Sequence, residues 1–286
     1  MNNTQTPISR RQFLKKSAQV TVALLGTASL SGVYSRWIEP YWIEIKHVNI
    51  KLSSLPPAFN HFRIVHFSDL HQGFHSKQEH LTELVEQVKY LKPDLICFTG
   101  DLLDKSTDYI SDAVNLFSQL QAPFGQYAVL GNHDAYGTRR AVTKGLPQAG
   151  FRILNNEHVM LTKGDDQLYL AGVDDPWVGK PDINQALRNI PKEACTILLA
   201  HEPDFADDYC KLPVDLQLSG HSHGGQVRIP FIGPLYTPPH GSKYPNGLYQ
   251  ISDSQLQVYT TRGIGVTRMP IRFNCRPELT VITLKV

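Results

Sequence analysis

The sequence predicts an α/β fold, a four-layer α-β-β-α sandwich in which two central mixed sheets are flanked by helices. Segments of strand and helix character alternate through the first half of the chain, and strand-like segments dominate the second half. No linker rich in Pro, Gly or Ser divides residues 34–286, which we therefore predict to form one domain. The chain has 286 residues, and 41% of them are hydrophobic. This composition excludes disordered and fibrous proteins.

The first half of this domain alternates between strands and helices. Residues 43–52 alternate apolar and polar side chains, which is typical of a half-buried strand. Apolar residues at helical spacing predict a helix over 79–91, which ends before Pro93. By the same criteria, further strands are predicted at 62–67, 95–98, 127–130 and 151–154, and further helices at 110–120 and 139–146.

The second half is predicted to be rich in strands. A helix over 183–190 precedes a buried strand at 196–200, and the proline-rich segment 230–245 is predicted to be a surface loop. The remaining strands are predicted at 159–162, 168–173, 214–218, 225–228, 248–251, 256–260 and 279–284.

Charge is distributed unevenly along the chain. The formal net charge is +2, but residues 1–33 carry four basic and no acidic side chains, which leaves 24 basic against 26 acidic residues elsewhere. This balance predicts no nucleic-acid binding surface, which requires a basic face. Four scattered cysteines are too few for a disulfide scaffold, and we predict that all are unpaired: Cys97, Cys195, Cys210 and Cys275.

The N-terminus carries a pattern of its own. Residues 9–16 have the sequence SRRQFLKK, and the apolar stretch Val20–Val33 follows. This order resembles the twin-arginine export signal. Residues 1–33 are therefore predicted to be a signal peptide or signal anchor recognised by the twin-arginine export machinery. The stretch has about 14 residues, fewer than the ~20 that span a bilayer.

This signal implies a location in the cell envelope, on the periplasmic or cell-wall side. The alternative is a basic tail that precedes a helix, and cleavage and membrane tethering both stay open. Trp37, Tyr41 and Trp42 follow the stretch, and they either lie at a membrane interface or pack on the core.

Polar side chains of a restricted set follow five apolar strands. The carboxyl edge of an open α/β sheet is where ligands bind. Carboxylate, imidazole and amide groups without thiolates suit two divalent ions such as Mn, Fe, Zn, Co or Ni. The alternative, polar turns and helix caps, would require the same coincidence after five strands. The residues are Asp69 and His71, Asp101 and Asp104, Asn132, His133 and Asp134, His201, and His221 and His223.

Within these segments five short motifs stand in a fixed order over 155 residues: Asp69-x-His71, Gly100-Asp101-x-x-Asp104, Gly131-Asn132-His133-Asp134, His201 and Gly220-His221-x-His223. In this order they resemble the calcineurin-like metallophosphoesterase superfamily, and no motif is missing. Together with the arginine signal and the segment 261–273, the chain resembles an exported bacterial branch. Ser222 stands where a Thr is more usual.

The resemblance implies a dinuclear metal-dependent phosphoesterase that hydrolyses phosphate esters outside the cytoplasmic membrane, by attack of a hydroxide that bridges the two ions. Two divalent ions outweigh two carboxylates and a hydroxide, so the site stays positive toward an anionic phosphate. The implied ligands of one ion are Asp69, His71, Asp101 and His223. Those of the other are Asp101, which bridges the ions, Asn132, His201 and His221.

The same resemblance implies that His133 is the general acid at the leaving group, and that its ring is held by a hydrogen bond that it donates to Asp104. For Asp104 an alternative is capping of the following helix. His66 and His75 lie out of register with the motifs and are predicted to be structural, whereas Arg262 is left unassigned.

The expected substrate is a small phosphate ester or a phospholipid-type molecule. A second hypothesis is a lipid or nucleotide-sugar pyrophosphatase that works at the membrane surface and associates with it. A third is a non-hydrolytic metal-binding scaffold, which would require gaps in the ligand set, and the sequence has none.

Overall fold

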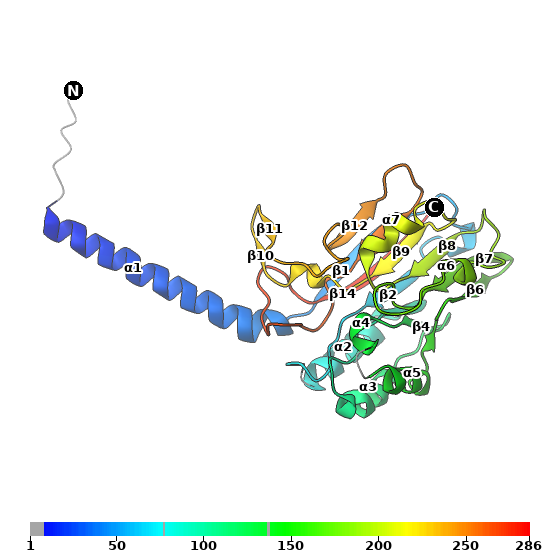
Figure 1. The fold of residues 1–286 in the computed structure, drawn as a ribbon, viewed down its shortest axis with the longest axis horizontal. Coiled ribbons are helices and arrows are strands. Elements are labelled where there is room, and N and C mark those ends of the chain that lie inside the picture. The colour runs from blue at the N-terminus through cyan, green and yellow to red at the C-terminus, as the bar shows by residue number, and fades with distance from the viewer. Residues whose placement is uncertain (1–8, 77, 136–137) are drawn as a thin grey trace, which may run out of the picture.

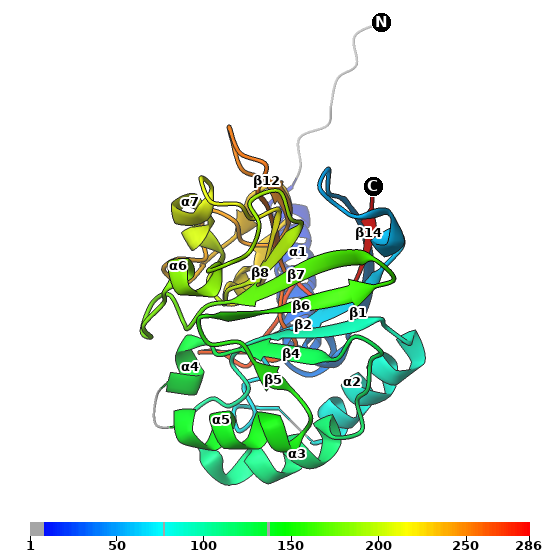
Figure 2. The same cartoon turned by 90° about the vertical axis from the view of Figure 1, so that its right-hand side faces the viewer.

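Two six-stranded mixed sheets stack face to face, and helices cover the outer face of each (Figures 1 and 2). The computed structural model describes residues 9–76, 78–135 and 138–286. This arrangement confirms the predicted four-layer α-β-β-α sandwich.

The first sheet is parallel except at one strand pair. Strands β2, β3, β4 and β5 run parallel, β14 is antiparallel to β2, and the edge strand β1 pairs with β14 in parallel. In order across the sheet the strands are β1 (Glu44–Lys51), β14 (Glu278–Lys285), β2 (Arg63–Phe67), β3 (Leu95–Thr99), β4 (Gln126–Val129) and β5 (Arg152–Ile153).

The second sheet has four parallel strands and an antiparallel strand at each edge. In order its strands are β12 (Gly247–Gln250), β13 (Gln257–Thr260), β9 (Leu216–Ser219), β8 (Thr196–Leu199), β7 (Asp166–Gly172) and β6 (Glu157–Lys163). A separate two-stranded hairpin consists of β10 (Arg228–Ile229) and β11 (Gly233–Pro234).

The helices pack on the outer faces because each buries one apolar stripe. In α2 (Gln78–Leu91) the residues at helical spacing, Leu81, Leu84 and Val88, are buried against the first sheet. The helices α3 (Ile110–Phe117) and α5 (Arg139–Gln148) cover the same face, and α6 (Ile183–Ala186) and α7 (Ala206–Tyr209) pack on the second sheet (Figure 2).

The interior between the two sheets is apolar. Residues such as Ile64 and Ile282 from the first sheet pack with Ile197 and Leu216 from the second. Cys97 belongs to this core and, like the other three cysteines, is free, which confirms the prediction of unpaired thiols.

The structure differs from the predicted elements mainly in short segments, whose conformation depends on local turns more than on hydrophobic pattern. The predicted strand 225–228 is largely a turn, because Gly224, Gly225 and Gln226 adopt positive φ values of 60°, 83° and 53°. The predicted loop 230–245 contains β11, and α6 ends at Ala186 rather than at residue 190. Neither α4 (Asn132–Ala135) nor α7 was predicted, since four residues show no periodicity.

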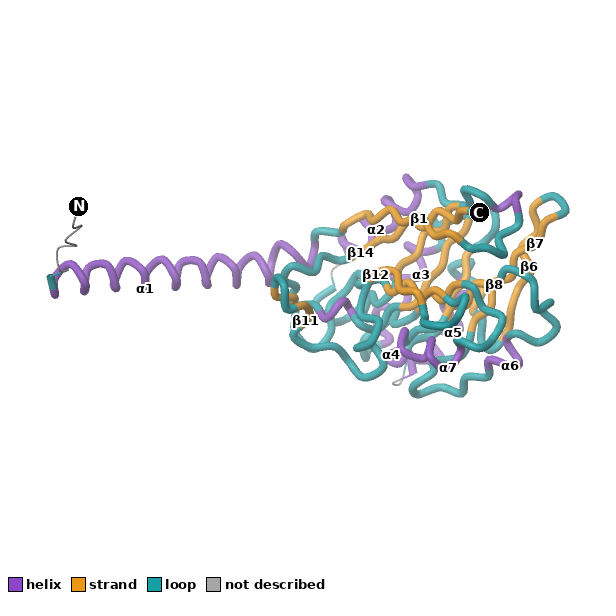
Figure 3. The backbone as a smooth tube through the Cα atoms, turned by 90° about the horizontal axis from the view of Figure 1, so that it is seen from above, coloured by secondary structure: helices purple, strands orange, loops and turns teal. Residues whose placement is uncertain are grey.

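The N-terminal helix α1 (Arg10–Val33) projects from the body and buries none of its residues (Figures 1 and 3). It begins with a capping box, in which Ser9 and Gln12 each accept a hydrogen bond from the other's backbone N–H. After it, one π-helical turn (Tyr34–Ile38) leads into the body. Within the described ranges no helix has both the length and the apolar character needed to cross a membrane.

Candidate metal centre

Loops that follow five strands, β2, β3 and β4 of the first sheet and β8 and β9 of the second, meet at one edge of the sandwich. These loops bring all nine predicted site residues together. Eight are buried: Asp69, His71, Asp101, Asp104, Asn132, His201, His221 and His223. The ninth, His133, leaves 23% of its side chain exposed.

Five of these residues lie in the left-handed region of backbone conformation, which side chains other than glycine rarely adopt. Their φ values are 56° at Asp69, 46° at His71, 60° at Asp101, 67° at His221 and 51° at His223. Strain of this kind persists only where surrounding contacts enforce it, and it concentrates at functional sites. The loops are thus held in conformations that aim the side chains inward.

Two glycines allow the loops to approach so closely. A Cβ atom on Gly131 would overlap the carboxylate of Asp101, and one on Gly220 would overlap the carboxylate of Asp69. Both glycines lie next to a predicted ligand in the sequence motifs. Their role is therefore to leave room for the carboxylates.

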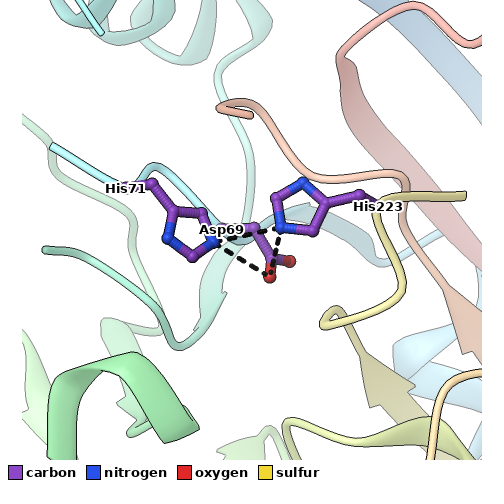
Figure 4. A group of neighbouring side chains, drawn as sticks. All are labelled: Asp69, His71 and His223. Carbon is purple, nitrogen blue, oxygen red and sulfur yellow. Dashed lines mark hydrogen bonds and ion pairs between the residues drawn. The ribbon is translucent and has the colours of Figure 1, made fainter. Parts of the chain in front are cut away.

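The first group of ligand atoms consists of Asp69, His71 and His223 (Figure 4). Asp69 Oδ1 lies 3.4 Å from His223 Nε2 and 3.9 Å from His71 Nε2, and the two ring nitrogens are 3.0 Å apart. The three atoms converge on one point, as ligands of a common cation do. This set fits one metal ion.

Asp101 joins this group to a second one, which contains Asn132, His201 and His221. Its Oδ2 atom lies 3.5 Å from His71 Nε2 and 3.2 Å from His201 Nε2, while Oδ1 accepts a hydrogen bond of 2.8 Å from the backbone N–H of His133. A single carboxylate oxygen thus lies between histidines of both groups. This is the placement expected of a residue that bridges two ions.

Tautomers in the second group follow from hydrogen bonds to carbonyls, which can only accept. His201 Nδ1 donates to the Thr99 carbonyl at 2.6 Å, so Nε2 is the ring atom that faces the site and offers a lone pair there once it has lost its proton. His221 Nε2 donates to the Pro239 carbonyl at 2.8 Å, which leaves Nδ1 a lone pair 3.0 Å from Asn132 Oδ1. Two acceptors that face each other call for a cation between them, so these residues fit a second metal ion.

Protonation of the four histidines divides them into two classes. Burial lowers the pKa of His221 to about 3 and that of His223 well below its usual range, so both are neutral at pH 7, as ligands must be. Burial also acts to lower the pKa of His71 and His201, but neighbouring carboxylates outweigh it and raise both values. The carboxylates thus draw positive charge into the site.

Asp104 is close to two histidines. Its Oδ1 atom lies 3.2 Å from His133 Nδ1 and 3.5 Å from His71 Nδ1. The helix that follows is capped by Ser106, whose hydroxyl accepts a hydrogen bond of 3.1 Å from the N–H of Asp108. The carboxylate therefore faces the site instead of capping, and its role toward His133 stays a prediction.

Asp134 holds the two central loops together, a role that was not predicted from the sequence. Its carboxylate accepts hydrogen bonds from the N–H groups of Gly131, Asp101 and Leu102 at 3.0, 2.8 and 2.9 Å. Burial raises its pKa to about 7, with the charge of Asp101 adding to the effect. The motif position of Asp134 next to His133 was the signal, but its partners depend on the tertiary fold.

Two further buried carboxyl groups, those of Glu202 and Asp175, lie near His201. Glu202 is fully buried, and burial together with the neighbouring carboxyl of Asp175 raises its pKa well above its usual range. Its carboxyl lies with ring nitrogens of His201 and His221 in a group close enough to bind a metal. Glu202 follows His201 directly in the chain, whereas no sequence signal indicates Asp175.

The residues predicted to be structural, and the unassigned one, lie outside the ligand groups. His66 is buried and forms a hydrogen bond of 2.8 Å with the Thr99 hydroxyl, and His75 accepts one of 3.3 Å from Arg36. Arg262 forms ion pairs of 2.6 Å with Glu278 and 2.9 Å with Glu44. These ion pairs account for Arg262 without a substrate.

Comparisons with known proteins find a matching family and several similar chains. The family model described as "Calcineurin-like phosphoesterase" matches residues 62–225. The "Uncharacterized metallophosphoesterase YkuE" of Bacillus subtilis is 42% identical over 282 residues, covering 97% of this chain and 98% of the relative. "Phosphodiesterase YaeI" of Escherichia coli is 32% identical over 289 residues, covering 97% and 99%. A 5'-nucleotidase precursor from Thermus thermophilus is similar with a TM-score of 0.49 and 14% identity, covering 78% and 54%.

Proposed function

This chain belongs to the calcineurin-like phosphoesterase family and is a metal-dependent phosphoric ester hydrolase, and from that premise we propose that it hydrolyses phosphodiesters on the outer side of the cytoplasmic membrane. The observation that carries the proposal is Asp101, whose Oδ2 atom lies between His71 and His201 at 3.5 and 3.2 Å. A shared carboxylate of this kind supports catalysis that uses two ions at once.

Seven residues would hold the two ions. When bound, the ions supply Lewis acidity toward a phosphoryl oxygen and generate a nucleophile from water near neutral pH. One ion would take Asp69, His71, Asp101 and His223, and the other Asp101, Asn132, His201 and His221.

His133 is suited to protonate the leaving oxygen. Its Nδ1 atom lies 3.2 Å from the Asp104 carboxylate, which leaves Nε2 to carry the proton that can move. The backbone N–H of His133 donates to Asp101 at 2.8 Å, which holds the main chain at His133 next to a predicted metal ligand. Asp104 in this arrangement orients the ring and stabilises its charged form.

A diester substrate is supported by the Escherichia coli relative, which is called a phosphodiesterase and aligns along nearly its whole length. The outer location is supported by the arginine pair at Arg10 and Arg11, followed by an apolar stretch. The complete ligand set argues against a non-hydrolytic scaffold.

A panel of esters tests the proposal. The purified full chain is stripped of metal, reconstituted with Mn, Zn, Fe or Mg, and assayed with bis-nitrophenyl phosphate, nitrophenyl phosphate and a nucleotide-sugar diphosphate. We expect the diester to have a kcat/KM at least ten times that of the monoester with at least one metal. A monoester or diphosphate preference would contradict the diester assignment, and no hydrolysis with any metal would favour the scaffold.

A further inference from the structure

We propose that the hairpin β10–β11, the loop 267–271 and Trp37 form a docking surface for an anionic lipid bilayer, next to the metal centre. The proposal rests on the proposed function in one respect: docking would direct hydrolysis to phosphodiesters of the lipid headgroup region. The occupant is a bilayer, and its recognition depends on exposed apolar side chains with arginines among them.

The docking surface exposes large apolar side chains at the tip of the hairpin and around it. Phe231 is fully exposed, Ile232 is 73% exposed, Leu235 60%, Met269 57% and Trp37 61%. Isolated apolar residues are common on protein surfaces, but a group of this kind indicates an interaction site.

Backbone hydrogen bonds join the three segments into one unit. The N–H of Arg272 donates to the Ser35 carbonyl at 3.0 Å, which ties the 267–273 segment to the turn that carries Trp37. The N–H of Arg228 donates to the Phe273 carbonyl at 2.9 Å, which ties the same segment to β10. The apolar side chains therefore share one supporting structure, and Figures 1 and 3 show the hairpin beside the base of α1.

The charge around these side chains favours an anionic partner. The Arg268 guanidinium lies over the ring of Tyr236 at 4.7 Å, and that of Arg36 over Trp37 at 5.5 Å. No Asp or Glu occurs between residues 216 and 252 or between 254 and 277, and the carboxylate of Glu39, near Trp37, is buried and accepts hydrogen bonds from the N–H groups of Asn274 and Cys275. Aromatic rings paired with arginines suit the boundary between acyl chains and anionic headgroups.

The same segment that forms the hairpin also holds the metal centre. The Arg228 guanidinium donates to the Gly224 carbonyl at 2.9 Å, directly after His223. Beyond the hairpin, the Pro239 carbonyl accepts the 2.8 Å hydrogen bond from His221 that sets its tautomer. Docking of the hairpin on a bilayer would therefore bring two predicted ligands close to the headgroups.

A bilayer fits this surface better than a second protein chain. A stable protein interface buries roughly 800 Å² on each partner over a flat, well-packed patch. Here the most exposed side chains lie at the tip of a hairpin whose strands are two residues long. A tip of this shape can insert into a bilayer but offers no flat face for a protein partner. The C-terminal end of α1, where its apolar stretch ends, lies in the same region of the molecule.

Vesicle partition of the full chain tests the docking surface. Phe231→Asp with Ile232→Asp is compared with Met160→Asp with Tyr90→Asp, which changes two exposed residues on β6 and α2. Each double variant is made in the wild-type chain and in a chain that also carries Leu24→Asp and Leu25→Asp. These two changes lie on exposed positions of α1, so they weaken any membrane binding by α1 and leave the body unchanged.

On phosphatidylglycerol vesicles we expect the hairpin pair to lower the partition coefficient at least tenfold in the weakened background, and the control pair to leave it within twofold. Arg36→Gln with Arg268→Gln should weaken binding to phosphatidylglycerol but not to phosphatidylcholine, and salt should weaken only the former. Equal partition of the hairpin and control pairs would overturn the proposal. So would a dimer, seen by sedimentation, that the hairpin pair dissociates.

Two activity assays separate this proposal from the proposed function. We expect the hairpin pair to keep its kcat/KM for a water-soluble diester within twofold and to lose at least tenfold on a phosphodiester lipid in vesicles. Loss on both substrates would mean that the hairpin belongs to the catalytic site and would overturn the docking role. If wild type hydrolyses neither diester, the proposed function fails, while the partition measurement still decides docking.

Discussion

Among individual residues, Asp101 contacts both groups of ligand atoms. One carboxylate oxygen faces His71 and His201, and the other accepts the N–H of His133. Because neutralising this residue removes a ligand from both ions, Asp101→Asn should reduce bound metal from about two per chain to nearly none. Elemental analysis after dialysis measures this.

Asp104→Asn is the matched control, since Asp104 contacts ring nitrogens but is not a predicted ligand, and it should retain its metal. Full occupancy in the Asp101 variant would exclude a bridging role.

His133 is distinguished from the ligands by its expected kinetic effect. His133→Ala should lower kcat by ~10²–10⁴-fold while metal content stays intact, because only proton transfer to the leaving oxygen is lost. The loss should be small for a nitrophenolate leaving group, which needs little protonation, and largest for an alkoxide. Assays with a matched pair of diesters measure the difference. Loss of metal, or equal losses with both leaving groups, would show that His133 is a ligand or a positioning residue.

His66 is expected to make stability depend on pH. Burial lowers its pKa to about 3, so below pH 6.5 the unfolded chain binds a proton that the folded chain does not. Its contribution is constant above pH 6.5, and the free energy of unfolding falls by up to about 1.4 kcal/mol per pH unit as the pH drops from there toward 3. His66→Gln should remove this slope from the plot of the free energy of unfolding against pH. Denaturant titrations at several pH values, with EDTA present, measure the plot. Parallel curves for the two proteins would contradict this.

The site residues could be predicted from the sequence because each directly follows an apolar strand, and parallel strands end at the same edge. The contacts of Asp134, Glu202 and Asp175 could not be predicted, because they depend on how separate loops meet. The ligand roles themselves stay predictions that metal analysis will decide.

Among the elements, the loops after β2 and β9 meet at a point where only glycine fits. The structure leaves no room for a Cβ on Gly220, where it would overlap Asp69 and Ser68. Gly220→Ala should therefore displace the Asp69 carboxylate and lower both metal content and the midpoint of thermal unfolding. Calorimetry and elemental analysis measure these effects. Gly26→Ala is the control, because a Cβ there meets nothing within 4 Å, and a variant at Gly220 that matches this control would refute the packing argument.

Long, periodic elements were the most predictable ones. The prediction of a helix over 79–91 differs from α2 by a single residue, because its apolar stripe is strong. The hairpin β10–β11 was not predicted, since its strands are two residues long and its turn depends on the positive φ values of Phe231, 67°, and Gly233, 98°. Such turns depend on local conformation more than on hydrophobic pattern.

For the whole molecule, α1 and the body stand as separate parts, and we predict that α1 directs export. Arg10→Lys with Arg11→Lys keeps the charge but removes the guanidinium geometry, so the folded protein should stay in the cytoplasm. Cell fractionation with an activity assay measures this. Lys15→Arg with Lys16→Arg is the matched control and should be exported. Normal export of the first variant would exclude the twin-arginine hypothesis.

The layer arrangement of the whole molecule could be predicted because alternating elements followed by strands allow few topologies. The pairing of β1 with β14 could not, since the two strands are more than two hundred residues apart in the chain. The sequence also did not predict that α1 projects from the edge of the body with none of its residues buried, because this depends on tertiary structure.

The place of β14 also bears on timing during synthesis. β14 follows every other strand along the chain, yet it lies between β1 and β2. Until the ribosome has made it, β1 has no partner and β2 is an open edge. A nascent chain therefore cannot complete the sheet whose loops carry Asp69 and Asp101 until translation has passed residue 285, and we expect metal to be captured after that point. Any ions carried outward with a folded chain would then come from the compartment of synthesis, so the supply of metals there would decide which ions the enzyme holds.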